Sequence, residues 1–333
     1  MPRCPGLRTL LLALAAIAAA PAAAAAEGPA FPSQPIELVV PFPAGGATDV
    51  IGRLVAQLAS EELGQPVVVQ NKSGATGAIG SEYVARAAPT GTTLLIATAS
   101  THAVLPAYRT DLSYDTVASF TPIALLATFP NLLVVNPQKV PATSVAELIA
   151  LLKQRPGQLN FASSGAGGSV HFAGELFKLK TGTDMQHVPY RGSAPALNDL
   201  LAGVVDMTFD NMTTVWPLAQ DGRLRALGVA SLERTALAPD LPTIAETVPG
   251  FEATSWVGVV GPAGLPQATV DRLADVFARA IRSPAVTRRL TELGAAAAAL
   301  RADDFRAFIL SDRAKWQRVA TDAHLTAKGK ETP

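Results

Sequence analysis

Residues 36–58, IELVVPFPAGGATDVIGRLVAQL, decide the fold class of this chain. The opening IELVV is almost entirely apolar and predicts a buried strand, whereas apolar side chains at positions 51, 54, 55 and 58 recur at helical spacing. Thr48 or Asp49 is expected to cap that helix. A buried strand followed by a glycine-containing loop and an amphipathic helix is typical of an α/β protein with parallel strands.

The same alternation continues along the chain. Residues 67–69, 93–97 and 132–135 predict further buried strands, and the apolar repeat at 270, 273, 274, 277 and 281 predicts a core-facing helix. A long C-terminal helix is expected after Asp303 or Asp304, either of which suits a helix cap.

Two lobes are expected, although no Gly/Ser-rich or Pro-rich linker separates two halves. The apolar stretches 123–135 and 251–262 are the candidate crossings between them. We therefore predict one lobe from residues 27–129 plus 254–333 and a second from residues 130–253, with a hinge at the paired crossings.

The N-terminus predicts a cleaved secretory signal over residues 1–26. Arg3 and Arg8 precede an apolar run at 10–20 that is too short to span a bilayer, and Ala-x-Ala triplets follow. A retained anchor is the alternative. Because Cys4 is the single cysteine and would leave with the signal, disulfides and thiolate metal sites are not expected in the mature chain. Lys plus Arg and Asp plus Glu both number 27, so no basic field invites nucleic acid or an anionic membrane.

The loop at residues 41–49, here called the first loop, is a candidate anion site. It lies between a strand and a helix, where ligands bind in α/β sheets. Gly45 and Gly46 allow close backbone approach, and the start of the following helix supplies partial positive charge. A simple tight turn with Asp49 as a helix cap remains the alternative.

Residues 163–169, SSGAGGS, here called the second loop, repeat this architecture in the other predicted lobe. Its hydroxyls offer hydrogen-bond donors without bulk, which suits a carboxylate. Six further residues are candidate polar or aromatic contacts, and for each both a binding and a structural interpretation stay open. They are Ser100 and Thr101 at the end of a strand, Tyr190 and Arg191 in HVPYRG at 187–192, and Asp206 and Asp210 in a strand-like segment.

Enzyme interpretations have little support. A serine hydrolase would need Ser164 or Ser169 with His171 or His187 and an aspartate, yet no Gly-x-Ser-x-Gly elbow is present. The glycines at 74–80 lack the spacing of a dinucleotide loop, and the histidines show no metal-binding motif. We therefore expect no catalytic residue, no metal and no cofactor.

Taken in order, residues 34–49, GQPVVVQN at 64–71, the second loop, HVPYRG at 187–192 and PDLPTIAE at 239–246 resemble the Bug-type receptors. These are the extracytoplasmic solute-binding proteins of tripartite tricarboxylate transporters. The resemblance also includes residues 255–262 and the C-terminal helices, so it covers nearly the whole mature chain.

The resemblance implies a two-lobed periplasmic-binding-protein fold (Venus flytrap, type II-like) with a ligand cleft between lobes joined by two crossing strands. It implies periplasmic capture of a small dicarboxylate, amino acid or aromatic acid without catalysis. The implied partners are that acid and the membrane components of the transporter, and we expect a monomer. A receptor feeding a signalling system is the alternative. Asp206 and Asp210 fall where such proteins tune the distal end of the ligand, and the carboxylate would be held largely through Phe42, Ala44, Gly45, Gly46 and Asp49 on one side and Ser163, Ser164, Gly165 and Ser169 on the other.

Overall fold

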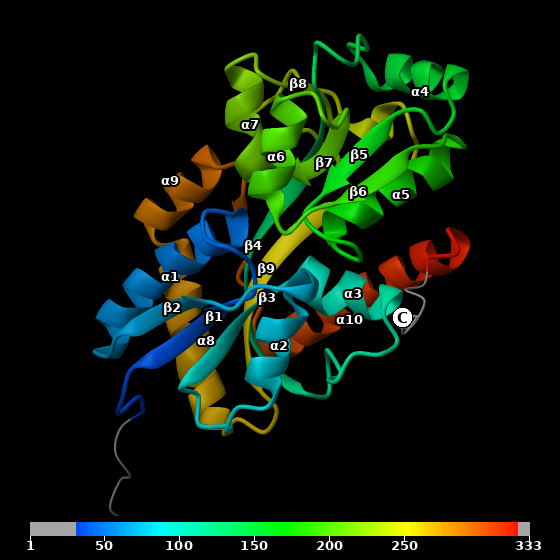
Figure 1. Cartoon of the computed structure of the whole chain (residues 1–333). Coiled ribbons are helices and arrows are strands. Elements are labelled where there is room, and N and C mark those ends of the chain that lie inside the picture. The colour runs from blue at the N-terminus through cyan, green and yellow to red at the C-terminus, as the bar shows by residue number, and fades with distance from the viewer. Residues whose placement is uncertain (1–30, 326–333) are drawn as a thin grey trace, which may run out of the picture.

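The structure, a computed structural model, describes residues 31–325 of the 333-residue chain (Figure 1). The signal predicted for residues 1–26, with Cys4, lies outside the described residues. Between residues 31 and 325, no helix has the length and apolar character needed to cross a bilayer.

Strands and helices alternate as the periodicity predicts. The strands are β1 (Ile36–Val40), β2 (Val67–Asn71), β3 (Thr93–Thr98), β4 (Phe120–Val135), β5 (Asn160–Ser163), β6 (Gln186–Pro189), β7 (Met207–Asn211), β8 (Arg225–Val229), β9 (Thr254–Pro262) and β10 (Ala296–Ala297). The helices are α1 (Ala47–Leu63), α2 (Ala78–Ala85), α3 (Leu105–Tyr108), α4 (Val145–Gln154), α5 (Ser169–Thr181), α6 (Ser193–Leu201), α7 (Met212–Gln220), α8 (Gln267–Arg282), α9 (Pro284–Glu292) and α10 (Ala302–Asp322). Shorter helical turns are η1 (Ala75–Gly77), the π-helical η2 (Ala99–Val104) and η3 (Ile244–Glu246).

Two sheets share one long strand. The strand order is β2-β1-β3-β9-β4-β7-β5-β6, with β8 and β10 also paired to β4. β1 pairs in parallel with β2 and β3, and β5 pairs in parallel with β6 and β7. Figure 1 shows one group of helices around each sheet, with β4 and β9 running between the groups. The predicted α/β fold with two lobes and two crossing strands is confirmed.

Between the lobes, β4 changes its pairing partner at the point where β9 begins. β4 pairs with β9 through Pro130, opposite Thr254, and pairs with β7 from Asn131 onward. Just before β9, the Ala253 N–H donates to the Ala230 carbonyl, which follows β8. These contacts place a joint near the division expected from sequence, and the exact boundaries of the lobes stay a prediction.

The core continues across this joint. Trp316 of α10 meets the edge of Phe172 of α5 with 6.1 Å between ring centroids, and both side chains are fully buried. α10 packs against β4, η2 and α3, whereas α5 packs against β5 and β7 of the second lobe. The contact between Trp316 and Phe172 therefore connects the cores of the two lobes.

Two predicted helix caps are wrong. α1 begins at Ala47 with Gly46 as the N-cap, and α10 begins at Ala302 with Arg301 as the N-cap. Asp49, like Asp303 and Asp304, lies inside the first helical turn, where a carboxylate still favours the positive end of the helix. The helices begin earlier than the spacing indicated because the glycine or arginine adopts an extended backbone and the chain turns there.

Candidate functional site

A cavity of about 330 Å³ lies between the lobes and is here called the central cavity. Five strands end at this cavity. The loops that follow β1, β3, β5 and β6 contribute lining residues, and so does Asn211, the last residue of β7. From the first lobe and the crossing strands, the lining residues are Phe42, Pro43, Ala44, Gly45, Gly46, Ala47, Thr48, Thr98, Ala99, Ser100, Phe129, Ser255 and Trp256. From the second lobe they are Ser164, Ser169, Val170, Gly192, Ser193, Ala194, Pro195, Leu197, Asn211, Thr213 and Thr214.

Four helices begin at the central cavity. The N-caps of α1, α6 and α7 line it, and α5 contributes its first residue, Ser169. None of these four N-caps makes a side-chain capping hydrogen bond. The first N–H groups of a helix have no partner within the helix and carry partial positive charge. Because no formally charged side chain is among the lining residues, these helix ends dominate the electrostatics of the cavity.

Asp49 braces the first loop from behind. Its Oδ2 accepts from the Gly45 N–H and from Arg53 Nε, both at 3.0 Å, and its Oδ1 accepts from Asn71 Nδ2 at 2.9 Å. Asn71 Nδ2 also donates to the Phe42 carbonyl at 3.0 Å. Burial raises the pKa of Asp49, but the hydrogen bonds from Arg53, Gly45 and Asn71 together lower it below its usual value. An ionised carboxylate therefore holds the loop and occupies the Gly45 amide.

The glycines of the second loop face the first lobe. A Cβ at Gly165 would lie 2.7 Å from Thr76 Oγ1, and a Cβ at Gly168 would lie 3.2 Å from Thr76 Cγ2. Thr76 Oγ1 donates to the Ala166 carbonyl at 2.8 Å, and the Ser169 N–H donates to Ser100 Oγ at 3.0 Å. The lobes are thus in contact across the cleft, and the missing side chains permit that approach.

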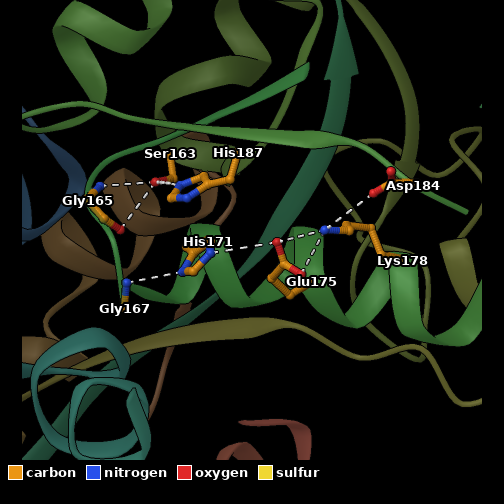
Figure 2. Close-up of polar contacts among 8 residues, drawn as sticks. All are labelled: Ser163, Gly165, Gly167, His171, Glu175, Lys178, Asp184 and His187. Atoms are coloured by element: carbon orange, nitrogen blue, oxygen red, sulfur yellow. Dashed lines mark hydrogen bonds and ion pairs between the residues drawn. The ribbon is translucent and has the colours of Figure 1, made fainter. Parts of the chain in front are cut away.

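A polar network that includes two histidines outside the cavity lining contacts the second loop (Figure 2). Ser163 Oγ lies 2.6 Å from His187 Nε2, and the Gly167 N–H donates to His171 Nδ1 at 3.1 Å. His171 also approaches Glu175 of the same helix. Sequence reasoning named both histidines only as possible hydrolase bases, whereas here they contact the Ser163 hydroxyl and the Gly167 backbone of the second loop.

Seven of the fifteen predicted ligand-binding residues line the central cavity, and their contact with a ligand stays a prediction. They are Phe42, Ala44, Gly45, Gly46, Ser100, Ser164 and Ser169. The structure does not bring the other eight to the cavity. They are Asp49, Thr101, Ser163, Gly165, Tyr190, Arg191, Asp206 and Asp210.

Three of these eight lie beside the loops rather than at the cavity. Ser163 is fully buried against His187, Gly165 faces Thr76, and Thr101 is buried in a reciprocal cap in which its Oγ1 accepts from the Thr98 N–H. Their polar groups are already used within the protein. With Asp49, they position cavity residues from behind.

In the segment HVPYRG at 187–192, the side chains of Tyr190 and Arg191 do not line the cavity. The Tyr190 hydroxyl donates to Asp199 Oδ2 at 2.6 Å, and burial together with that carboxylate raises the pKa of Tyr190 to about 12. Arg191 is exposed. Its neighbours Gly192 and Ser193 line the cavity instead, because α6 starts there and directs its N-terminus inward.

The two aspartates occupy different places. Asp206 precedes β7 at the end away from the cavity, where its Oδ2 accepts from the Asn160 N–H at 2.8 Å. Asp210 is fully buried under the cavity wall, and its Oδ1 accepts from the Asn211 N–H at 2.7 Å. Burial raises the pKa of Asp210 above its usual value. Both aspartates stabilise strand ends.

Sequence reasoning missed much of the cavity wall. It did not predict Phe129, Ser255 or Trp256 on the crossing strands, nor the start of α7 at Asn211, Thr213 and Thr214. One usable signal was Ser255-Trp256 within an otherwise apolar crossing, and another was the strand-to-helix junction at Asn211.

The serine hydrolase arrangement is not assembled. Ser169 Oγ lies 3.1 Å from Ser100 Oγ, and the serine that contacts a histidine is the fully buried Ser163. Ser163 is not among the cavity-lining residues, so a substrate in the cavity would not reach its hydroxyl. In residues 31–325, no group of three or more His, Cys, Asp or Glu side chains is arranged to hold a metal ion.

Comparison with known proteins identifies the family. The family model of the tripartite tricarboxylate transporter family receptor matches residues 51–325. This chain belongs to that family. BugT of Bordetella pertussis (strain Tohama I) is 37% identical over 294 residues, which cover 88% of this chain and 90% of BugT. The resemblance to Bug-type receptors drawn from the sequence is therefore confirmed.

Solved structures of similar chains carry small acids. The structure of R. palustris Rpa4515 with adipate has a TM-score of 0.86 and 39% identity, covering 89% of this chain and 100% of that chain. MatC (Rpa3494) from Rhodopseudomonas palustris with bound malate has a TM-score of 0.82 and 32% identity, covering 87% of this chain and 99% of that chain. This receptor has its central cavity between its two lobes.

Proposed function

We propose that this receptor captures a small organic carboxylate in the central cavity, in the periplasm, and delivers it to the membrane components of a tripartite tricarboxylate transporter. The observation that carries the proposal is the convergence of four helix N-termini, none with a side-chain cap from its N-cap residue, on a cavity without a charged lining residue. Binding of adipate and malate by proteins of the same family supports the carboxylate.

The first loop offers the clearest carboxylate contact. Gly46 and Ala47 line the cavity, and the first backbone hydrogen bond of α1 is donated by Val50 to the Gly46 carbonyl. The amides of the N-cap and first turn therefore precede the helical hydrogen-bond ladder and can donate to a ligand oxygen. Ser100, Ser164 and Ser169 add hydroxyl donors from both lobes. Neutral donors of this kind can replace the hydration shell of a carboxylate.

Lobe closure would complete the site. The boundaries proposed for the lobes, residues 27–129 plus 254–333 and residues 130–253, divide the cavity lining between them. We further propose cleavage of residues 1–26 on export and a monomeric mature receptor. Size-exclusion chromatography with light scattering and N-terminal sequencing of the exported protein test these two points.

Isothermal titration calorimetry of a panel of organic acids tests the proposed function. At least one acid, with adipate and malate in the panel, is expected to bind, and its affinity should depend weakly on salt because no exposed ion pair is screened. A steep loss of affinity with added salt would contradict binding by neutral donors. The absence of binding to any carboxylate would reject the proposed function.

We propose that the receptor performs no chemistry on its ligand. Incubation with a panel of esters should give no hydrolysis above background, both for the natural chain and for Ser164→Ala. Turnover that disappears in Ser164→Ala would revive the hydrolase alternative.

A further inference from the structure

Two histidines stack behind the second loop (Figure 2). The rings of His171, from α5, and His187, from β6, lie 3.8 Å apart between centroids at an interplanar angle of 19°. The His171 side chain is buried and that of His187 is half-buried. Neither lines the central cavity, so the pair acts on a ligand only through the loop it supports.

The hydrogen bond at His171 specifies its protonation state. The Gly167 N–H donates to His171 Nδ1 at 3.1 Å. A backbone N–H can only donate, so Nδ1 must be unprotonated and the ring proton must reside on Nε2. Nε2 faces Glu175 Oε1 at 3.7 Å. The loop backbone is therefore built against a neutral imidazole.

His187 holds the other end of the loop. Its Nε2 lies 2.6 Å from Ser163 Oγ, which also accepts from the Gly165 N–H at 3.2 Å. His187 thus contacts Ser163, which is adjacent in sequence to Ser164, and His171 contacts Gly167, which is two residues before Ser169. Ser164 and Ser169 both line the cavity.

The surroundings do not favour a positive charge on either ring. On α5, Lys178 Nζ lies 3.1 Å from Glu175 Oε2 and 3.8 Å from Asp184 Oδ1, so the nearby carboxylates already have a cationic partner. Tyr108 of α3 presents its ring edge-on to His171, with 5.7 Å between centroids. Burial raises the pKa of Glu175, which weakens it as a counter-ion.

Burial is also the main cause of low histidine basicity. It lowers the pKa of His171 to about 3, with further lowering from His187 and Lys178, and it lowers the pKa of His187 to about 4, with a smaller contribution from Lys178. Both rings are neutral at the pH of most growth media, and acid is the condition that would change them.

We infer that His171 and His187 are positioning residues that hold the second loop in its ligand-binding form only while both are neutral, so that acid weakens binding. The inference rests on the proposed function, because the loop is taken to contact the carboxylate. A proton on His171 Nδ1 would face the Gly167 N–H donor to donor and break that hydrogen bond. Two imidazolium rings at the observed separation would also repel each other.

The experiment compares the natural chain with the double variant His171→Asn, His187→Gln. The amide oxygens of these side chains can accept hydrogen bonds near the positions of Nδ1 and Nε2, yet they do not titrate. Adipate affinity is measured by calorimetry at about pH 7 and about pH 4, and the ratio is taken within each protein. Protonation of adipate itself changes both ratios equally.

At about pH 4, roughly half of His187 and a tenth of His171 would be protonated, so the affinity of the natural chain is expected to fall about twofold more than that of the double variant. Equal ratios would overturn the inference. His171→Leu, which removes the acceptor, should bind adipate weakly at both pH values while circular dichroism shows an unchanged fold.

A ligand-free measurement separates this inference from the proposed function. The amide resonance of Gly167 is followed by NMR from about pH 7 to about pH 3, where about half of His171 would be protonated, together with the His171 ring nitrogens. A Gly167 shift that follows protonation of His171 supports the inference even if adipate does not bind. A Gly167 resonance that stays fixed while His171 titrates overturns it, whatever the ligand proves to be.

Discussion

Gly46→Val should abolish carboxylate binding and leave the fold intact. Gly46 has φ −80° and ψ 168°, an extended conformation open to any residue, and a Cβ there would meet only the Pro43 carbonyl oxygen, at 3.9 Å. The fold therefore accommodates the side chain. Replacing a glycine N-cap by valine costs about 1 kcal/mol of stability, because valine is a poor N-cap.

The expected loss of binding is much larger. Valine at this position would crowd the approach to the Gly46 and Ala47 amides, which line the cavity. Hydrogen bonds to a charged group contribute about 1.5–3 kcal/mol each. Losing two of them gives about 3–6 kcal/mol, which is at least a hundredfold in the dissociation constant.

Calorimetry with the tightest acid of the panel measures this loss, and thermal unfolding measures the stability. Ser144→Val is the matched control, because Ser144 caps α4 away from the cavity with its side chain accepting from the Glu147 N–H. It should lose a similar stability and keep full affinity. Gly46→Val with natural affinity would refute the assignment of the first loop as the carboxylate site.

Three further outcomes are expected. Asp49→Asn should weaken binding about tenfold without unfolding the protein, because the ion pair with Arg53 and the bracing of the first loop are lost; unchanged affinity in calorimetry would argue against this bracing role. Asp210→Asn should raise the melting temperature at neutral pH and raise it less in acid. The pKa of this buried carboxyl is raised in the folded protein, so its ionisation as pH rises destabilises the fold, and asparagine removes that cost. A melting temperature that falls equally at both pH values would contradict that sign. Gly168→Ala should shift the receptor toward an open form, because the added Cβ would press on Thr76 at 3.2 Å, and small-angle X-ray scattering of the ligand-bound state should show a larger radius of gyration than for the natural chain.

Local sequence patterns were sufficient for the architecture. The strand β1 has the predicted bounds, Ile36–Val40, and the crossings expected at 123–135 and 251–262 are β4 and β9. Apolar periodicity reports which residues are buried, and burial over a few residues distinguishes strand from helix. The position of the first loop could be predicted equally well, because the strand, the glycine turn and the start of the helix follow one another directly in the sequence.

The same patterns did not decide which polar side chains reach the cavity. Asp49 and Ser164 both follow strands in glycine-containing loops, yet Asp49 turns back to Gly45 and Arg53 while Ser164 lines the cavity. Whether a loop side chain faces the ligand or its own backbone depends on which hydrogen-bond partners the neighbouring elements supply, and composition does not encode that.

The sequence by itself determined the fold class, the two crossings, the family and a glycine-containing loop that lines the central cavity, because each is carried by contiguous residues. Only the tertiary structure decided the composition of the cavity wall, the contact of the lobes at Thr76 and Ser100, and the pairing of His171 with His187. The physical reason is that hydrogen bonds and ring stacking act over a few ångströms in space, whereas these partners are brought within reach of one another only by folding.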